Sequence, residues 1–122
     1  MKFRSKFEKR VWGNVPEEVK GRVDYESKAS TLSYNTPATY TPDFDLGNGV
    51  YVECKGYFDS RARGKMARVK KQHPSRDIRF LFQRANNRIT KSPNSMTYGE
   101  WASKQGFLWH EGDRIPEEWY NE

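Results

Sequence analysis

The stretch that most constrains the fold of this chain is residues 39–56, which we predict to form a β-hairpin. The residues read Thr-Tyr-Thr-Pro-Asp-Phe-Asp-Leu-Gly-Asn-Gly-Val-Tyr-Val-Glu-Cys-Lys-Gly. Asn-Gly between apolar, β-branched and aromatic runs is one of the strongest local signals for a hairpin. We therefore expect one strand over residues 39–46, a turn over residues 47–49 and a second strand over residues 50–55.

The second strand carries a charged pair on one face. Side chains alternate along a strand, which predicts Tyr51, Glu53 and Lys55 on one face and Val50, Val52 and Cys54 on the other. We expect the apolar face to meet the core. The other face then holds a carboxylate and an ammonium near Asp43 of the first strand.

These residues suit metal-assisted hydrolysis of a phosphodiester. Hard divalent cations such as Mg²⁺ take oxygen ligands, neutralise charge and activate water. Asp43 and Glu53 are therefore candidate ligands, joined by the backbone carbonyl of Cys54. Lys55 can orient or deprotonate the attacking water, or stabilise the developing charge. The ordinary alternative is that Glu-x-Lys is a solvated pair and Pro-Asp a simple turn, although a position between the hairpin and a basic helix favours function.

Size and composition set the bounds on the molecule. A chain of 122 residues has room for one domain, residues 1–122, with one modest core. An aromatic content of 15% argues against disorder. The net charge of +6 favours a polyanionic partner, most simply nucleic acid.

Several classes of protein do not fit the sequence. No apolar run reaches the length of a membrane span and no signal-peptide core is visible, so we expect no membrane association. Cys54 is the only cysteine, which excludes an intrachain disulfide and fits a reducing cytosol. His73 and His110 lack zinc-site spacing, and without a Gly-rich phosphate loop we expect no nucleotide cofactor.

Helices and strands alternate along the rest of the chain. Before the hairpin we expect a helix over residues 5–12 opened by a Ser5-x-x-Glu8 capping box, a helical turn beginning at Pro16 and a strand over 23–26. Over the polar residues 27–37 we expect a strand that continues into an extended connector. After the hairpin we expect a helix over 60–72, a central parallel strand over 78–82 and a loop over 83–95. We then expect a helix from a Thr97-x-x-Glu100 capping box to Lys104, a strand over 107–109 and a turn over 115–119. The predicted class is α/β, with a mixed sheet flanked by helices.

Two basic segments are candidate DNA-binding surfaces. The helix over residues 60–72 has no acid and six cations: Arg61, Arg63, Lys65, Arg68, Lys70 and Lys71. Its expected buried stripe is Ala62, Met66 and Val69. The following loop carries Arg84, Arg88 and Lys91, again without an acid. A merely solvated surface is the alternative, but the helix directly follows the candidate site, which favours binding to phosphates.

A set of motifs resembles the endonuclease I family of bacteriophages. The motifs are Tyr40-Thr-Pro-Asp-Phe, Asn48-Gly, Val52-Glu-Cys-Lys-Gly, Gln72-His-Pro and Asp77-Ile-Arg. Phe3-Arg-Ser with Glu8, Tyr98-Gly-Glu and Ile115-Pro-x-Glu-Trp extend the resemblance over nearly the whole chain. The resemblance implies a Holliday-junction-resolving enzyme with the PD-(D/E)xK nuclease fold.

The resemblance also carries the family's catalytic residues onto this chain. Asp43 would be the carboxylate shared by two metals, Glu53 the second ligand and Lys55 the catalytic lysine. Glu8 would reach the second metal, and the N3 position of a capping box is its competing role. A further family glutamate falls on Asp24, and Glu26 is the alternative for that role.

The resemblance implies an intertwined, domain-swapped homodimer. Each active site would take Glu8 from one subunit and Asp43, Glu53 and Lys55 from the other, with residues 27–37 as the bridge. The predicted activity is cleavage of branched DNA with Mg²⁺, or Mn²⁺ as the alternative, and up to two ions per site, in the host bacterial cytoplasm if the protein is phage-encoded. The rival functions are another PD-(D/E)xK endonuclease, restriction-like or mismatch-nicking, and a catalytically silent DNA-binding protein of the same fold.

Overall fold

A five-stranded mixed sheet organises the chain in a computed structural model that describes residues 2–33 and 39–122. The strand order is β1-β4-β5-β6-β7, with β1 at Asp24–Tyr25, β4 at Phe44–Asp45, β5 at Val50–Lys55, β6 at Asp77–Phe82 and β7 at Leu108–Glu111. β1, β4 and β5 pair antiparallel, whereas β5, β6 and β7 run parallel. The prediction of a mixed α/β sheet with a central parallel strand after the basic helix is confirmed.

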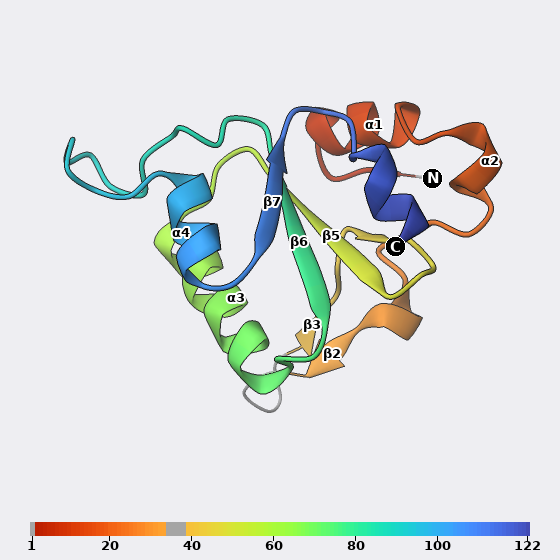
Figure 1. Cartoon of the computed structure of the whole chain (residues 1–122), viewed down its shortest axis with the longest axis horizontal. Coiled ribbons are helices and arrows are strands. Elements are labelled where there is room, and N and C mark those ends of the chain that lie inside the picture. The colour runs from red at the N-terminus through yellow and green to blue at the C-terminus, as the bar shows by residue number, and fades with distance from the viewer. Residues whose placement is uncertain (1, 34–38) are drawn as a thin grey trace.

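Helices cover both faces of this sheet (Figure 1). Two helices, α3 (Ser60–Gln72) and α4 (Tyr98–Lys104), pack on one face. The other face meets α1 (Lys6–Gly13) and the C-terminal 3₁₀ helix η2 (Glu117–Asn121). The short elements α2 (Glu17–Lys20) and η1 (Lys28–Ser30) flank β1 along the chain, and a separate two-stranded sheet pairs β2 (Leu32–Ser33) with β3 (Thr39–Tyr40).

Both faces of β5 are buried over residues 50–54, which does not fit the alternative of a solvated Glu-x-Lys pair. Val50, Val52 and Cys54 pack under α1 and η2. Tyr51, on the opposite face, joins the aromatic core under α3 and α4. A strand between two neighbours in a sheet with helices on both sides has no exposed face. Glu53 is therefore a buried carboxylate.

The predicted first strand of the hairpin, residues 39–46, is broken. Its two ends become β3 and β4, which belong to different sheets. Pro42 lies at the break, where proline has no N–H to donate to a ladder. The turn is where the sequence predicted it, because Gly47 and Gly49 have φ of 79° and 92° and the Leu46 N–H donates to the Val50 carbonyl over 3.0 Å.

The helix signals were mostly correct. Asp59 caps α3, Met66 and Val69 are buried on it with Ala62 partly buried beside them, and Thr97 with Glu100 forms a complete capping box on α4. In α1 the Ser5 side chain accepts from the Glu8 N–H, but the Glu8 carboxylate turns away to other partners.

Three further boundaries differ from the prediction. The expected strand over residues 23–26 shrinks to β1, and β7 begins one residue later and ends two residues later than expected. Over residues 27–37 the 3₁₀ helix η1 was not expected, whereas β2 is a short strand within the segment where one was expected; the last part of this segment lies outside the described residues. Within the described ranges no helix is both long and apolar enough to cross a membrane.

Candidate active site

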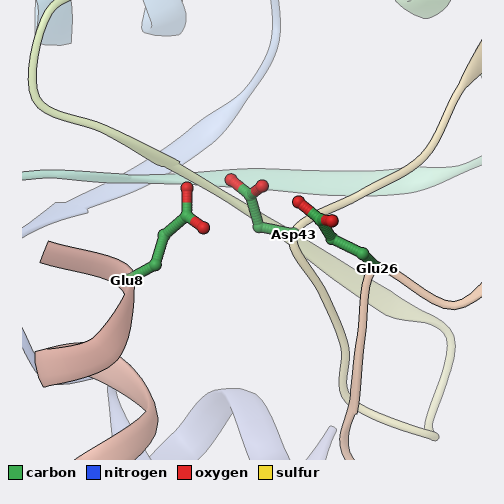
Figure 2. Close-up of side chains that lie close together, drawn as sticks. All are labelled: Glu8, Glu26 and Asp43. Atoms are coloured by element: carbon green, nitrogen blue, oxygen red, sulfur yellow. The ribbon is translucent and has the colours of Figure 1, made fainter. Parts of the chain in front are cut away.

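Three carboxylates from separate parts of the chain converge beside β5 (Figure 2). Glu8 comes from α1, Glu26 follows β1, and Asp43 directly precedes β4. One oxygen of each lies within 4.8 Å of the others, and Glu8 and Asp43 are buried. We call Glu8, Glu26 and Asp43 the carboxylate cluster.

The backbone holds each member of the cluster in place. The main-chain N–H of Cys54 donates to Asp43 Oδ2 over 2.8 Å, which fixes that carboxylate against β5. Glu26 has a φ of 48°, and its N–H donates to the Asp43 carbonyl over 3.0 Å. Glu8 stands in the first turn of α1, on the side that is buried with Phe7 and Val11. Local folding therefore brings the three side chains together.

Two residues from outside the cluster contact its glutamates. The Tyr25 hydroxyl donates to Glu8 Oε1 and accepts from the Arg4 N–H over 3.1 Å. Arg4 Nε lies 2.9 Å from Glu26 Oε2 as an ion pair. This buried oxygen has no hydrogen-bond partner among the described residues, so the arginine reaches it through charge alone.

Glu53 and Lys55 lie next to the cluster. The Tyr40 hydroxyl donates to Glu53 Oε1 over 2.8 Å, and Lys55 Nζ lies 3.4 Å from Glu53 Oε2. The Tyr40 contact comes from the α3 side of the sheet, whereas Glu8 approaches from α1 on the other side. The site therefore contains four acidic side chains and one lysine.

Burial disfavours ionisation of two of these acids, Asp43 and Glu53. Burial raises the pKa of the Asp43 carboxyl well above its usual range, and the neighbouring Glu53 and Glu8 carboxylates raise it further. Burial also raises the pKa of Glu53, although Lys55 and the Tyr40 hydroxyl lower it. A positive charge bound beside them would therefore favour the ionised form of these two carboxylates.

A divalent cation would suit the carboxylates of this cluster. Its preferred ligands are carboxylate oxygens, and the cluster offers three of them with one buried oxygen lacking a hydrogen bond. The Cys54 thiol is an unsuitable ligand because burial raises its pKa well above the usual range, so it stays protonated. Only its backbone carbonyl, as the sequence suggested, is a candidate.

Asp24 and Glu26, the two alternatives for the further acidic residue of the site, lie in different surroundings. Asp24 is exposed on β1, opposite Asp45 in the register with β4, and it is not a member of the cluster. Glu26, two residues later, belongs to the cluster. The alternation of a strand predicted both side chains on one face, but the positive φ of Glu26 ends the strand and redirects its side chain.

The six cations of α3 do not form one uniform surface. Arg61, Arg68 and Lys71 are exposed. Three others are partly buried and contact the protein: Arg63 donates to the Phe58 carbonyl over 2.7 Å, Lys65 lies over the Tyr40 ring, and Lys70 lies over the Phe107 ring. The Tyr40 ring under Lys65 belongs to the residue that donates to Glu53, and the positive charge of Lys65 lowers the pKa of that carboxyl.

The basic loop between β6 and α4 is exposed at all three predicted positions, Arg84, Arg88 and Lys91. Arg88 donates to the Ser95 carbonyl over 2.5 Å and pairs with Thr97 across the base of the loop. One of its three cations thus also has a structural role.

An open pocket of about 420 Å³ lies beside Glu8 and Lys55. Its lining includes Lys6, Glu8 and Arg10 of α1, Lys55 and Tyr57 at the end of β5, and Gln83 after β6. Three of the lining residues, Lys6, Arg10 and Lys55, are cations. The pocket therefore suits an anionic ligand that must approach Glu8 and Lys55.

Sequence reasoning missed the hydrogen-bonding residues of the site. Tyr25 and Tyr40 hold Glu8 and Glu53, and Arg4 pairs with Glu26. The only sequence signal for Tyr40 was its place in the Tyr-Thr-Pro-Asp motif, and Tyr25 lies between the two acids Asp24 and Glu26. Neither signal names a partner, because the partners lie 13 and 17 residues away.

Comparisons with known proteins cover all of these elements. A protein-family model described as phage endonuclease I matches residues 1–122. The chain is 40% identical over 124 residues to an endonuclease I of Escherichia phage T7, an alignment that covers 98% of this chain and 79% of that protein. It is 41% identical over 111 residues to an endodeoxyribonuclease 1 of Enterobacteria phage T3, covering 87% of this chain and 69% of that protein.

Proposed function

The chain belongs to the phage endonuclease I family, and from this membership and the carboxylate cluster we propose that it is a metal-dependent DNA endonuclease that cuts four-way Holliday junctions and other branched DNA. The observation that carries the proposal is the convergence of Glu8, Glu26 and Asp43 beside Glu53 and Lys55. Four buried or half-buried acids around one lysine are costly for folding alone, and they fit a site that binds cations.

Mg²⁺, or Mn²⁺ in its place, would be held by the carboxylate cluster with Glu53, up to two ions per site. The backbone carbonyl of Cys54 is a further oxygen within this part of β5. When bound, such ions neutralise phosphate charge and lower the pKa of a water molecule. We infer that the sheet is that of the PD-(D/E)xK nucleases, which is supported by Pro42-Asp43 and Glu53-Cys54-Lys55 meeting on neighbouring strands.

Lys55 is the proposed catalytic lysine. Its ammonium, 3.4 Å from Glu53 and on the lining of the pocket, is placed to reach a phosphate oxygen or water there. Lys55 can orient the water or stabilise charge on the phosphate, and a neutral Lys55 can accept a proton from the water. Tyr40 holds the carboxylate beside it.

The DNA partner is supported by charge. The net charge is +6, and exposed cations of α3 and of the loop after β6 lie on elements that directly follow β5 and β6. Lys6 and Arg10 add positive charge at the pocket. Such cations bind phosphates with little regard to base sequence, which suits recognition of DNA shape.

We also propose that the enzyme is an intertwined homodimer in which Glu8 is donated to the partner subunit's site. The described residues of one chain contain one carboxylate cluster, whereas symmetric cutting of two strands needs two sites. An exchange between subunits would reproduce the contacts of Glu8 and Asp43 described above.

The test compares a four-way junction with a duplex of the same sequence, each with and without Mg²⁺. We expect cleavage of the junction only, and only with metal. Glu53→Gln should abolish cleavage and retain junction binding, because it removes a ligand charge with almost no change in volume. Lys55→Ala should abolish cleavage and still bind metal. Equal cutting of duplex would favour a restriction-like or nicking enzyme, and binding without cutting would favour a silent DNA-binding protein.

A further inference from the structure

The pocket beside Glu8 and Lys55 has a wall that the proposed chemistry does not use. Tyr57 and Gln83 form this wall. Tyr57 lies only two residues after the catalytic lysine, and its side chain is 79% exposed. A singly exposed aromatic residue needs no explanation on an ordinary surface. Tyr57, however, lines the same charged pocket as Glu8 and Lys55.

The backbone that carries Tyr57 is firmly held. Phe58, the next residue, is fully buried and contacts the rings of Phe80, Phe82, Tyr98 and Trp101. The Phe58 N–H donates to the Tyr98 hydroxyl over 3.2 Å, and Arg63 donates to the Phe58 carbonyl over 2.7 Å. On the other side, the Gln83 N–H donates to the Lys55 carbonyl over 2.9 Å. Tyr57 is thus an exposed ring on a well-anchored segment.

Gly56, between Lys55 and Tyr57 in the chain, has no side chain and lies against Gln83. A Cβ placed on Gly56 would lie 3.0 Å from Gln83 Oε1, so the Gln83 amide lies against the backbone there. The side-chain amide of Gln83 is uncharged and can both donate and accept hydrogen bonds with a ligand. Lys6, Arg10 and Lys55 provide positive charge around the same pocket.

An aromatic ring, an amide and several cations in one pocket match the parts of a nucleotide. Bases stack on aromatic side chains, amides hydrogen-bond base edges, and Lys or Arg bind phosphates. We propose that Tyr57 stacks on an unstacked base of the strand being cut, at a nucleotide next to the scissile phosphate. The inference rests on the proposed nuclease function and extends it to a determinant of substrate choice.

This stacking would favour branched DNA. A base inside a duplex must leave its stack and its pairing partner before it can reach an outside ring, which costs less at a branch point or mismatch. Tyr57 would therefore stack on a base of a junction and not on a base of an intact duplex.

The test is a binding cycle on a four-way junction without Mg²⁺. Abasic sites are placed one at a time at the nucleotides flanking the cut, and the Kd is measured for the unaltered chain, Tyr57→Ala and Tyr57→Phe. At one position the missing base should weaken binding by the unaltered chain and Tyr57→Phe about 5- to 100-fold. Tyr57→Ala should bind the intact junction more weakly by a similar factor and be insensitive to the missing base.

Leu108→Ala is the matched control, because Leu108 is also apolar and 58% exposed, but on β7 outside the pocket lining. It should behave as the unaltered chain, and thermal melting should show that each variant folds. The stacking inference is overturned if Tyr57→Ala binds the intact junction as tightly as the unaltered chain, or remains as sensitive to the abasic site. If the unaltered chain cuts the junction with Mg²⁺ but the effects of the variant and the abasic site simply add, only the stacking inference fails. If it neither binds nor cuts the junction, the proposed function fails as well.

Discussion

Glu26 shows at the scale of one residue how the site is built at the expense of stability. Its φ of 48° is the left-handed region, which costs a side-chain-bearing residue about 1–2 kcal/mol. Its carboxylate then points at two others, and one of its oxygens lacks a hydrogen bond. Strain together with charge repulsion at a single residue is typical of a position retained for function.

The first prediction separates Glu26 from Asp24. Glu26→Gln should lower Mg²⁺ affinity about 10-fold or more, because it removes one charged ligand of the cluster, and should leave the metal-free protein at least as stable. Asp24→Asn, two residues earlier and exposed, should change neither quantity. Thermal melting with a Mg²⁺ titration measures both. The reverse pattern would assign the role to Asp24.

The second prediction concerns pH and rests on Asp43. Its raised pKa means that, between the ordinary carboxyl pKa and the raised value, the folded chain holds a proton that the unfolded chain has released. Stability of the metal-free protein should therefore fall as pH rises through that window, by about 1.4 kcal/mol per pH unit for one proton. Mg²⁺ binds the ionised form, so its stabilising effect should grow over the same range.

Denaturant unfolding from pH 4 to pH 8, with and without Mg²⁺, checks this expectation. Asp43→Asn is the control, since it can still accept the hydrogen bond from the Cys54 N–H but no longer titrates. It should flatten the metal-free slope relative to the unaltered chain. An identical slope in both proteins would mean that other groups cause the pH dependence.

At the scale of elements, α3 joins the site to the basic surface. Met66 and Val69 anchor it to the sheet, and the positive charge of Lys65 lowers the pKa of Glu53. Arg61 and Arg68 lie seven residues apart and therefore on one side of the helix. Both are exposed, which makes them better probes of DNA binding than Lys65, whose removal would also disturb Glu53.

The third prediction follows from this division. Replacing Arg61 and Arg68 by Ala should reduce the slope of log Kd against log salt concentration by about 0.9 for each phosphate that the variant no longer binds. Lys104→Ala, an exposed cation on α4, is the control and should leave the slope unchanged. Junction binding at several salt concentrations measures the slope. An unchanged slope in the double variant would return these arginines to a merely solvated surface.

The sequence predicted those elements whose signals are local. The Asn-Gly turn, the Thr97 capping box and the apolar strand ending at Phe82 were each predicted correctly, because a cap or turn depends on residues within a few positions. The break at Pro42 and the burial of both faces of β5 were not. Those features depend on which strands become neighbours, which involves residues far apart in the chain.

The site followed the same rule. Asp43, Glu53 and Lys55 were predicted from short motifs and Glu8 through resemblance, and the structure brings these four side chains close together. The hydroxyl donors Tyr25 and Tyr40 were missed. Glu26 was only an alternative to Asp24, because strand periodicity cannot reveal the positive φ that turns its side chain.

At the scale of the whole molecule, the site combines residues from both sides of residues 34–38 in the sequence. Glu8 and Glu26 come before residues 34–38, and Asp43, Glu53 and Lys55 come after them. One subunit can therefore complete its own site, or two subunits can exchange the first part and complete each other's sites. Light scattering should show a species of about twice the 14.4 kDa chain mass if the proposed dimer forms.

The fourth prediction tests the exchange directly. Glu8→Gln and Asp43→Asn chains, each inactive alone, are unfolded and refolded together, because an intertwined dimer exchanges slowly. If Glu8 is donated across the dimer, the heterodimer contains one site with both defects and one with neither. Nicking of one junction strand should then return, while paired cutting should not. Co-refolding Asp43→Asn with Glu53→Gln is the control and should stay inactive, because both residues belong to the same part of one subunit. If Glu8 acts within its own chain, every site in the first mixture carries one defect and no nicking appears.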